Sequence, residues 1–191
     1  MSDYFRLRID DRSELELLNQ SHAEELFELL DINREYLREW LPWLDNNRHF
    51  QNTIDFIKIS QGQYENNETV QFVLVHRGEL CGVVGFHKID WLNRSTSIGY
   101  WLGESYQGKG LITKACSKVL EYSFGRMGLN RIEIRCATEN LKSRAIPERL
   151  GFKDEGIIRD AEWLYDHYVD HIIYGMLESQ WRSSEKLVIT R

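Results

Sequence analysis

Two glycines in a short loop are the first feature of this sequence that points to chemistry. Gly108 and Gly110 stand in the stretch YWLGESYQGKGLITKA, residues 100–115, where a predicted strand gives way to a predicted helix. Glycine allows unusual backbone angles and close approach of a ligand. The backbone N–H groups from Gly108 to Thr113 would point together at the positive end of the helix dipole, which favours phosphate, and Lys109 would add a charge. The alternative is a plain loop that uses glycine only for its turn.

Two common phosphate-binding motifs do not fit this loop. A Walker loop has Lys and then Ser or Thr after its second Gly, whereas Lys109 precedes Gly110 here. A Rossmann fingerprint needs three glycines at fixed spacing within strand–helix–strand repeats, and the segments before this loop are predicted strands. A pyrophosphate bound through backbone amides, with Gln107 at the start of the motif, is the interpretation that fits.

The loop resembles the Q/R-x-x-G-x-G/A motif of the GNAT acetyltransferase superfamily, with Gln107 first and Gly110 fourth. Ile112 stands where the family usually has Gly or Ala, and its side chain is expected to crowd the cradle. A second segment, NLKSRAIPERLGF at 140–152, is similar to the family's N-x-x-S/A…G-F segment. With IGYWL before the loop, the pattern resembles the RimJ/RimL-type subgroup, which acetylates protein N-termini, over residues 14–178.

This resemblance implies acetyl-CoA as co-substrate, without a metal ion. The pantetheine arm would bond to the backbone at the end of a strand, where an N–H would also stabilise the developing oxyanion. For the strand residues the alternative is ordinary strand packing. For Asn140 and Ser143 the alternative is that one of them caps the helix that follows. The cofactor-binding residues implied are Tyr100, Trp101, Leu102, Gln107, Gly108, Lys109, Gly110, Leu111, Ile112, Thr113, Asn140 and Ser143.

The same resemblance implies two catalytic residues. Ser143 would lie by the cofactor sulfur and donate a hydrogen bond to the departing thiolate. Glu162 stands where RimL-type enzymes carry a water-activating glutamate and would take the proton of the attacking ammonium, directly or through a water. The ring of Trp163 is expected beside this carboxylate. A surface carboxylate is the alternative for Glu162, and Glu148 and Asp160 are the reserve bases.

The predicted function is an N-acetyltransferase that acts by direct transfer in a ternary complex, since no cysteine is matched with a histidine and an orienting residue for a covalent route. The subgroup favours the N-terminal α-amine of a protein, in particular a ribosomal protein. A small amine, such as a polyamine or an aminoglycoside, is the alternative acceptor. A non-catalytic acyl-CoA-binding module is the alternative of another class. A homodimer is expected from the resemblance only.

The elements that must position these residues follow from hydrophobic periodicity. Strands are predicted at 5–9, 15–17, 70–75, 80–89, 95–102, 131–137, 152–164 and 166–177. Helices are predicted at 21–30, with a Ser21–Glu24 capping box, and at 36–41, 53–63, 110–127 and 143–151, the last with Pro147 near its first turn.

This order indicates an α+β fold, and the resemblance makes it the GNAT fold, with a mixed sheet of about seven strands flanked by helices. The strands at 97–102 and 131–137 should be parallel and splay apart, because a crossover helix joins them. A single domain over residues 1–191, with a polar tail from about residue 179, is expected.

Composition limits the partners. A net charge of −6 makes a nucleic-acid backbone a poor partner and suits an amine, although solubility explains the same charge. Cys81, Cys116 and Cys136 match no metal or redox spacing and are predicted to be buried free thiols of a reducing cytosol. His87, His167 and His171 likewise match no metal spacing. Neither a signal peptide nor an apolar run of ~20 residues is evident, so a cytoplasmic location without a membrane partner is expected.

Overall fold

The computed structural model describes residues 5–189, which pack into two compact units. The first unit contains the described residues up to His87 together with Gly99–Lys118. The second contains Lys88–Ile98 and the described residues from Val119 onward. Strand β5 (Ser95–Leu102) and helix α4 (Leu111–Gly125) each contribute residues to both units.

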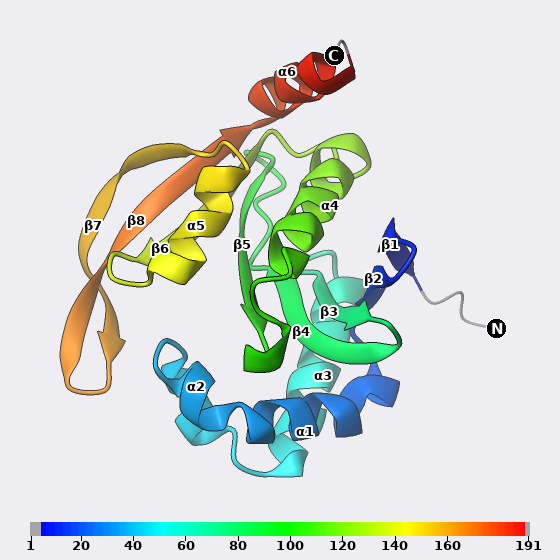
Figure 1. Cartoon of the computed structure of the whole chain (residues 1–191), viewed down its shortest axis with the longest axis vertical. Helices are drawn as coiled ribbons and strands as arrows, with labels where there is room; N and C mark the ends of the chain where they lie inside the picture. Colours follow the sequence, from blue (N-terminus) through cyan, green and yellow to red (C-terminus); the bar gives the residue numbers. More distant parts are fainter. Residues whose placement is uncertain (1–4, 190–191) are drawn as a thin grey trace. The chain divides into compact units, whose positions relative to one another are not determined.

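The first unit combines antiparallel strands with three α-helices (Figure 1). Its strands pair in sequence order, with Leu15 opposite Leu74 and Phe72 opposite Val84. The strands are β1 (Arg6–Asp10), β2 (Ser13–Leu17), β3 (Gln71–His76) and β4 (Glu79–Phe86). The helices are α1 (Ala23–Ile32), α2 (Arg34–Arg38) and α3 (Phe50–Glu65), with short 3₁₀ helices η1 (Gln20–His22), η2 (Pro42–Asn46) and η3 (Glu104–Tyr106).

A hydrophobic cluster holds these helices on the strands. Leu26 and Leu30 lie one turn apart on α1, so both face the cluster, where they meet Ile57 of α3. Val73 and Val83 face each other across β3 and β4 and join the same cluster. Each fully buried side chain of this size contributes about 1.5–3 kcal/mol, so the helices are fixed to the sheet mainly by this cluster.

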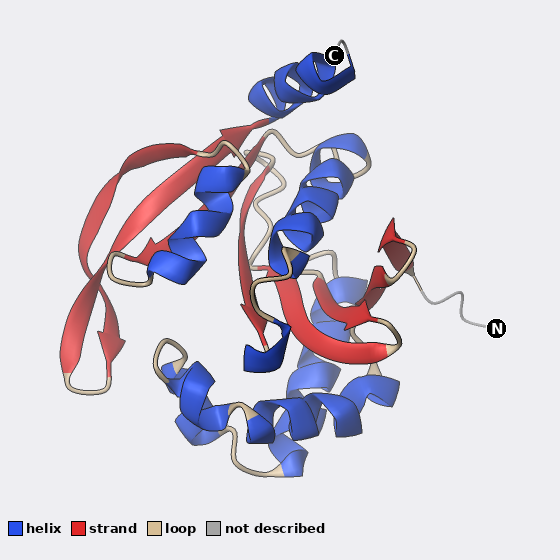
Figure 2. Cartoon of the chain, in the orientation of Figure 1, coloured by secondary structure: helices blue, strands red, loops and turns tan. Residues whose placement is uncertain are grey.

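The second unit contains the parallel strand pair and a long hairpin (Figure 2). Parallel pairing joins Ser95–Ser97 of β5 to Arg131–Glu133 of β6, and the ladder ends there. Both β6 and β7 pair antiparallel with β8, and α5 lies against β6 (Figure 1). The elements are β6 (Arg131–Ala137), α5 (Leu141–Arg149), β7 (Lys153–Leu164), β8 (His167–Leu177) and α6 (Glu178–Ile189).

The predicted fold class is confirmed. Hydrogen bonding orders the strands β1-β2-β3-β4-β5-β6-β8-β7, a mixed sheet of eight strands flanked by helices. The parallel pair is the one expected on either side of the crossover helix. The sheet has eight strands rather than about seven, because each predicted strand, including both strands of the short first hairpin, joins it.

Two local predictions are wrong. The capping box at the first helices is formed by Asn19 and His22 rather than by Ser21 and Glu24. Pro147 lies inside α5, which begins at Leu141, so the helix lacks one backbone donor there. Separately, α6 begins within the polar tail that is expected from about residue 179, and its Trp181 ring lies 6.4 Å, centroid to centroid, from that of Phe124.

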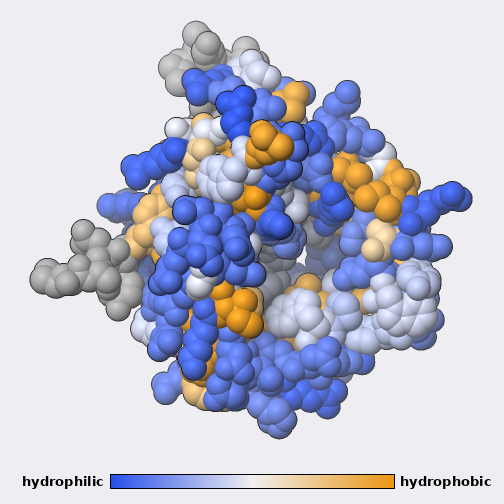
Figure 3. All heavy atoms as spheres, turned by 180° about the vertical axis from the view of Figure 1, so that it is seen from behind, coloured by the Kyte–Doolittle hydropathy of each residue, from blue (hydrophilic) through white to orange (hydrophobic). Residues whose placement is uncertain are grey.

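Hydrophilic residues cover most of the visible surface (Figure 3). The face drawn in Figure 3 is mostly hydrophilic, and its hydrophobic residues form small, separate patches. Single exposed hydrophobic residues are normal for a folded protein. Within the described residues, no helix has both the length and the apolar character that a membrane span requires.

We expect Gly82→Ala to destabilise the protein. A Cβ on Gly82 of β4 would lie 2.4 Å from the carbonyl oxygen of Trp101, so the two backbones would have to separate. Overpacking of this kind costs about 1–3 kcal/mol. Gly62→Ala in α3 is the matched control, because a Cβ there meets nothing within 4 Å and alanine favours helices. In thermal unfolding, Gly82→Ala should lower Tm while Gly62→Ala should keep or raise it; equal Tm values would contradict the clash.

Candidate active site

The loop between β5 and α4 presents a row of unpaired backbone donors. Gly108 and Gly110 have φ angles of +71° and +70°, which favour glycine. The first helical bond of α4 runs from the N–H of Lys114 to the carbonyl of Gly110, 3.1 Å. Within the described residues, none of the six N–H groups from Gly108 to Thr113 donates to a protein acceptor. This cluster, called the amide cradle below, confirms the backbone geometry that the two glycines predicted and suits an anion.

A buried asparagine holds the start of this loop. Asn33 accepts a hydrogen bond from the N–H of Glu104, 2.8 Å, and donates one to the carbonyl of Leu29, 2.8 Å. The N–H of Gly103 donates to the carbonyl of Cys81, 2.9 Å. The loop is therefore anchored to both α1 and β4 before it reaches the cradle.

Ile112 does not crowd the cradle as expected. Its side chain is only 6% exposed and belongs to the buried core, as does that of Leu111. The first turn of α4 thus turns these two side chains into the protein and leaves their amides outside. The departure from the family motif at this position is accommodated by packing.

Two further groups lie near the loop. The side-chain nitrogen Nε2 of Gln107 is buried and makes no hydrogen bond of good geometry, which is costly for a donor. Burial raises the pKa of Tyr36 and the nearby carboxylates of Glu104 and Glu39 raise it further, whereas the Gln107 side chain lowers it. Tyr36 therefore stays protonated as a donor. The hydrophobic pattern around Tyr36 predicted only a helix. Its place near the loop could not be predicted, because burial by distant segments leaves no local sequence signal.

The end of β5 carries the residues expected along the pantetheine arm. Tyr100, Trp101 and Leu102 are the last residues of the strand and are half-buried. Trp101 packs against the hydrophobic cluster of the first unit. Since neighbouring side chains alternate along a strand, those of Tyr100 and Leu102 face the opposite side.

Asn140 and Ser143 lie together at the start of α5. Asn140 is the N-cap residue, and its Oδ1 accepts a hydrogen bond from the N–H of Ser143, 3.1 Å. The Oγ of Ser143 lies 3.3 Å from the Sγ of Cys136 at the end of β6. The capping alternative is therefore confirmed for Asn140, and its Nδ2 is the group that can still donate to a ligand.

Glu162 makes a contact that the sequence did not predict. Its Oε2 lies 3.1 Å from Nε2 of His171, with side chains 38% and 17% exposed. Glu162 lies opposite Val169, so the side chain of His171 two residues later falls on the same face of the hairpin. The expectation that Trp163 lies beside this carboxylate is wrong, because its ring points to the other face and packs edge-on against Tyr168, 4.8 Å between centroids.

The two reserve bases differ in their contacts. Glu148 of α5 accepts a hydrogen bond from the hydroxyl of Tyr174, 2.9 Å. Asp160 has a φ of +49°, and its backbone N–H donates to the carboxylate of Asp170, 2.8 Å. The carboxylate of Glu148 thus has a structural contact, whereas the choice of Glu162 over Asp160 rests on the family resemblance.

Each unit gathers part of the predicted site. The first unit holds the end of β5 and the cradle, and the second holds Asn140 with Ser143 and Glu162 with His171.

Cys81, Cys116 and Cys136 are buried free thiols, as predicted, and burial raises the pKa of Cys81 to about 12. No group of three or more metal-ligating side chains occurs among the residues that the structure describes.

Comparisons with known proteins show which family this chain resembles. Residues 12–153 match the model of the acetyltransferase (GNAT) domain. YdaF of Bacillus subtilis (strain 168) is 35% identical, covering 95% of this chain and 100% of its own length. The ribosomal-protein-serine acetyltransferase of Escherichia coli (strain K12) is 31% identical, covering 91% of this chain and 98% of its own.

Solved structures show the same similarity. RimL, a ribosomal L7/L12 alpha-N-protein acetyltransferase in complex with coenzyme A, superposes with a TM-score of 0.89 at 25% identity, covering 92% of this chain and 99% of its own. The microcin C7 self-immunity acetyltransferase MccE, in complex with acetyl-CoA and AMP, has a TM-score of 0.84 at 31% identity, covering 88% and 94%.

Substitution of Asn140 should separate its capping role from ligand binding. Asn140→Ala removes the cap acceptor and should lower the free energy of unfolding by about 1 kcal/mol. Asn140→Asp keeps an acceptor oxygen at the same place, so its stability should stay near that of the unaltered protein. Denaturant unfolding measures both. If the alanine variant were as stable as the aspartate variant, the cap would contribute nothing.

Proposed function

The chain belongs to the GNAT acetyltransferase family, and we propose that this enzyme transfers the acetyl group of acetyl-CoA to the N-terminal α-amine of a protein, in particular a ribosomal protein. The observation that carries the proposal is the amide cradle, six N–H groups without a protein acceptor at the start of α4. The names of the E. coli relative and of RimL support the choice of acceptor.

The cradle fits the pyrophosphate of coenzyme A. An anion there would accept hydrogen bonds from amides that otherwise lack acceptors and would lie at the positive end of the α4 dipole. Acetyl-CoA supplies the acetyl group as a thioester. In this proposal the backbone of Tyr100–Leu102 binds the pantetheine arm, and Gln107 and the Nδ2 of Asn140 add side-chain donors.

Each catalytic residue has one task in the transfer. Glu162 accepts the proton that the acceptor ammonium must lose before its nitrogen attacks the thioester carbon. A backbone N–H near Tyr100 donates to the carbonyl oxygen as it gains negative charge. Ser143 donates a hydrogen bond to the sulfur as the carbon–sulfur bond breaks, and the released thiolate takes up a proton. His171 holds the Glu162 carboxylate through the 3.1 Å contact.

An α-amine suits this machinery. An α-amino group has a pKa of about 8 and a lysine side chain about 10.4, so a larger fraction of α-amine is neutral at pH 7. Trp43 of η2 is 40% exposed, and Trp40 in the turn between α2 and η2 is half-buried; in this proposal both contact the acceptor chain. A small cationic amine is the second candidate, because the E. coli K12 spermidine N(1)-acetyltransferase is 24% identical over 82% of this chain.

We also propose a single domain that works in the cytoplasm as a homodimer. The family match at 12–153 includes residues of both compact units, and β5 and α4 run through both. Buried free thiols suit a reducing compartment. The β7–β8 hairpin exposes Ile157, Trp163 and Tyr168, which a second copy would cover.

Glu162→Gln tests the base. The amide cannot accept the ammonium proton, so kcat should fall by about 100-fold or more. Coenzyme A affinity, measured by calorimetry, should not change. Glu65→Gln, which removes an exposed carboxylate at the end of α3, is the charge-matched control and should leave kcat unchanged. A Glu162→Gln enzyme with full kcat would eliminate Glu162 as the base.

Acceptor choice can be measured directly. We expect acetyl transfer to a peptide with a free N-terminal serine to exceed transfer to spermidine by at least about tenfold in kcat/KM, and mass spectrometry should find the acetyl group on the α-nitrogen. A peptide with a blocked N-terminus and one internal lysine is the control. Preference for spermidine would favour the small-amine acceptor. A chain that binds no coenzyme A would refute the function as a whole.

A further inference from the structure

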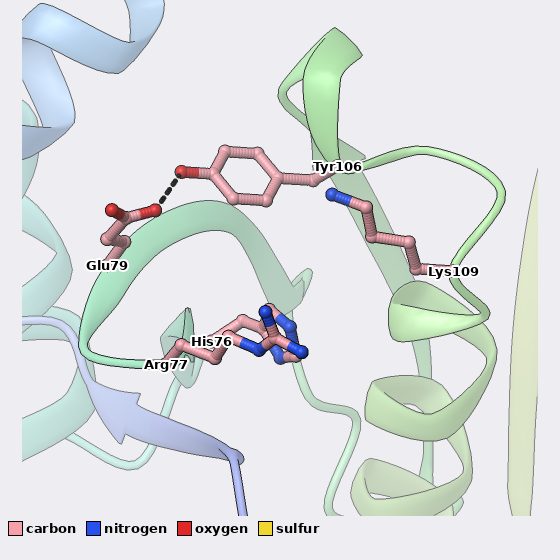
Figure 4. Close-up of a pocket in the computed structure, with 5 residues that line it drawn as sticks. All are labelled: His76, Arg77, Glu79, Tyr106 and Lys109. Atoms are coloured by element: carbon pink, nitrogen blue, oxygen red, sulfur yellow. Dashed lines mark hydrogen bonds between the residues drawn. The ribbon is translucent and has the colours of Figure 1, made fainter.

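A small pocket lined by charged and polar residues lies beside the amide cradle in the first unit, although most of its lining surface is apolar (Figure 4). It is lined by His76, Arg77 and Glu79 from the β3–β4 hairpin and by Tyr106 and Lys109 from the loop before α4. The volume is about 180 Å³. Pockets that hold a whole small molecule are typically about 300–1,000 Å³, so this one suits a single chemical group.

The pocket has a fixed wall. The hydroxyl of Tyr106 donates to the carboxylate of Glu79, 2.9 Å, which ties the loop to the hairpin. Burial, and then the bond to Glu79, raise the pKa of Tyr106 to about 12, so the phenol stays protonated as that donor. Figure 4 shows this pair on one side of the pocket and Arg77 with His76 on the other.

Lys109 links the pocket to the cradle. Its backbone N–H is one of the six unpaired amides, and it stands between the two glycines with positive φ. Its ammonium donates to the carbonyl of Ser105, 2.9 Å, and lies 5.2 Å from the centroid of the Tyr106 ring. These contacts turn the side chain toward Tyr106 and the pocket (Figure 4).

Arg77 is an unusual residue for its position. It has a φ of +56° in the two-residue turn between β3 and β4, followed by Gly78 at +83°. Such turns favour Asn or Gly at the first position, and a residue with a long side chain is strained there by about 1–2 kcal/mol. Among the described residues, its guanidinium has no hydrogen-bond or ion-pair partner. The conformation of the turn therefore does not explain why position 77 is an arginine.

His76 adds a further donor. Its Nδ1 lies 2.9 Å from the hydroxyl of Ser13. With Ser13 as the donor in this bond, the neutral ring carries its proton on Nε2. The pocket thus combines a guanidinium, an ammonium and an imidazole N–H against one carboxylate, which is already bonded to Tyr106.

We propose that this pocket binds the 3′-phosphate of coenzyme A, so that the cofactor is held at two anion sites that share Lys109. The inference rests on the proposed cofactor role of the cradle. A phosphate monoester carries nearly two charges at pH 7 and three acceptor oxygens, which match the bidentate guanidinium, the ammonium and the imidazole N–H. The pyrophosphate occupies the amides, and the 3′-phosphate occupies the side chains.

The test compares coenzyme A with 3′-dephospho-coenzyme A by calorimetry at one fixed ionic strength. The unaltered protein should bind coenzyme A at least about tenfold more tightly, because a charged hydrogen bond is lost with the phosphate. Arg77→Asn should abolish this preference, lowering coenzyme A affinity about tenfold while leaving that of the dephospho form unchanged. Because Asn suits the turn, Tm should stay the same or rise.

Arg12→Asn is the matched control. It removes another exposed arginine of the first unit, one that does not line the pocket, and should keep the preference for coenzyme A. Equal affinity of the unaltered protein for both forms would overturn the inference and leave the proposed function standing. Equal weakening of both forms by Arg77→Asn would also overturn it, because Arg77 would then contact the pyrophosphate. Failure to bind either form would refute the proposed function itself.

Discussion

The proposed use of this structure depends on one local feature. Six consecutive backbone N–H groups, from Gly108 to Thr113, have no hydrogen-bond acceptor among the described residues. A helix start always leaves such donors, but water or a side-chain cap usually satisfies them. Here two residues with positive φ lie among these donors, and the helix dipole adds to their positive potential. An anion with several oxygens can satisfy many of these donors together, which is why a diphosphate suits the site better than a single carboxylate.

The surrounding elements keep that group rigid. Asn33 connects the junction of α1 and α2 to the residue that begins η3, and Gly103 bonds back to β4. Leu111 and Ile112 anchor the first turn of α4 in the core, so the exposed residues Gly108–Gly110 lead directly into a buried turn. Pre-organised donors need no rearrangement when a ligand arrives, and binding free energy is not spent on ordering them.

In the second unit, the positions of the proposed catalytic side chains depend on the register of the β7–β8 hairpin and on the N-cap of α5. The β7–β8 pairing fixes which side chain accompanies Glu162, and a shift of one residue would replace His171 with a residue from the other face. At α5 one asparagine both caps the helix and lies next to the proposed leaving-group donor Ser143. Structural and functional explanations of Asn140 are therefore compatible, since the cap uses Oδ1 and leaves Nδ2.

The sequence by itself determined the order of strands and helices, the parallel pair across α4, the glycine loop and the family motif, because each depends on local periodicity or on residue types at short spacing. It also predicted that the cysteines are buried. Only the tertiary structure decided that His171 accompanies Glu162, that Ile112 is buried, and that Arg77 and Lys109 line one pocket. These contacts depend on the register of a hairpin or on the packing of segments that are distant in the sequence. No local sequence pattern specifies which face a side chain occupies or which residue becomes its partner. The capping box at Asn19 and the position of Pro147 were mispredicted for a related reason: competing local signals are resolved by packing.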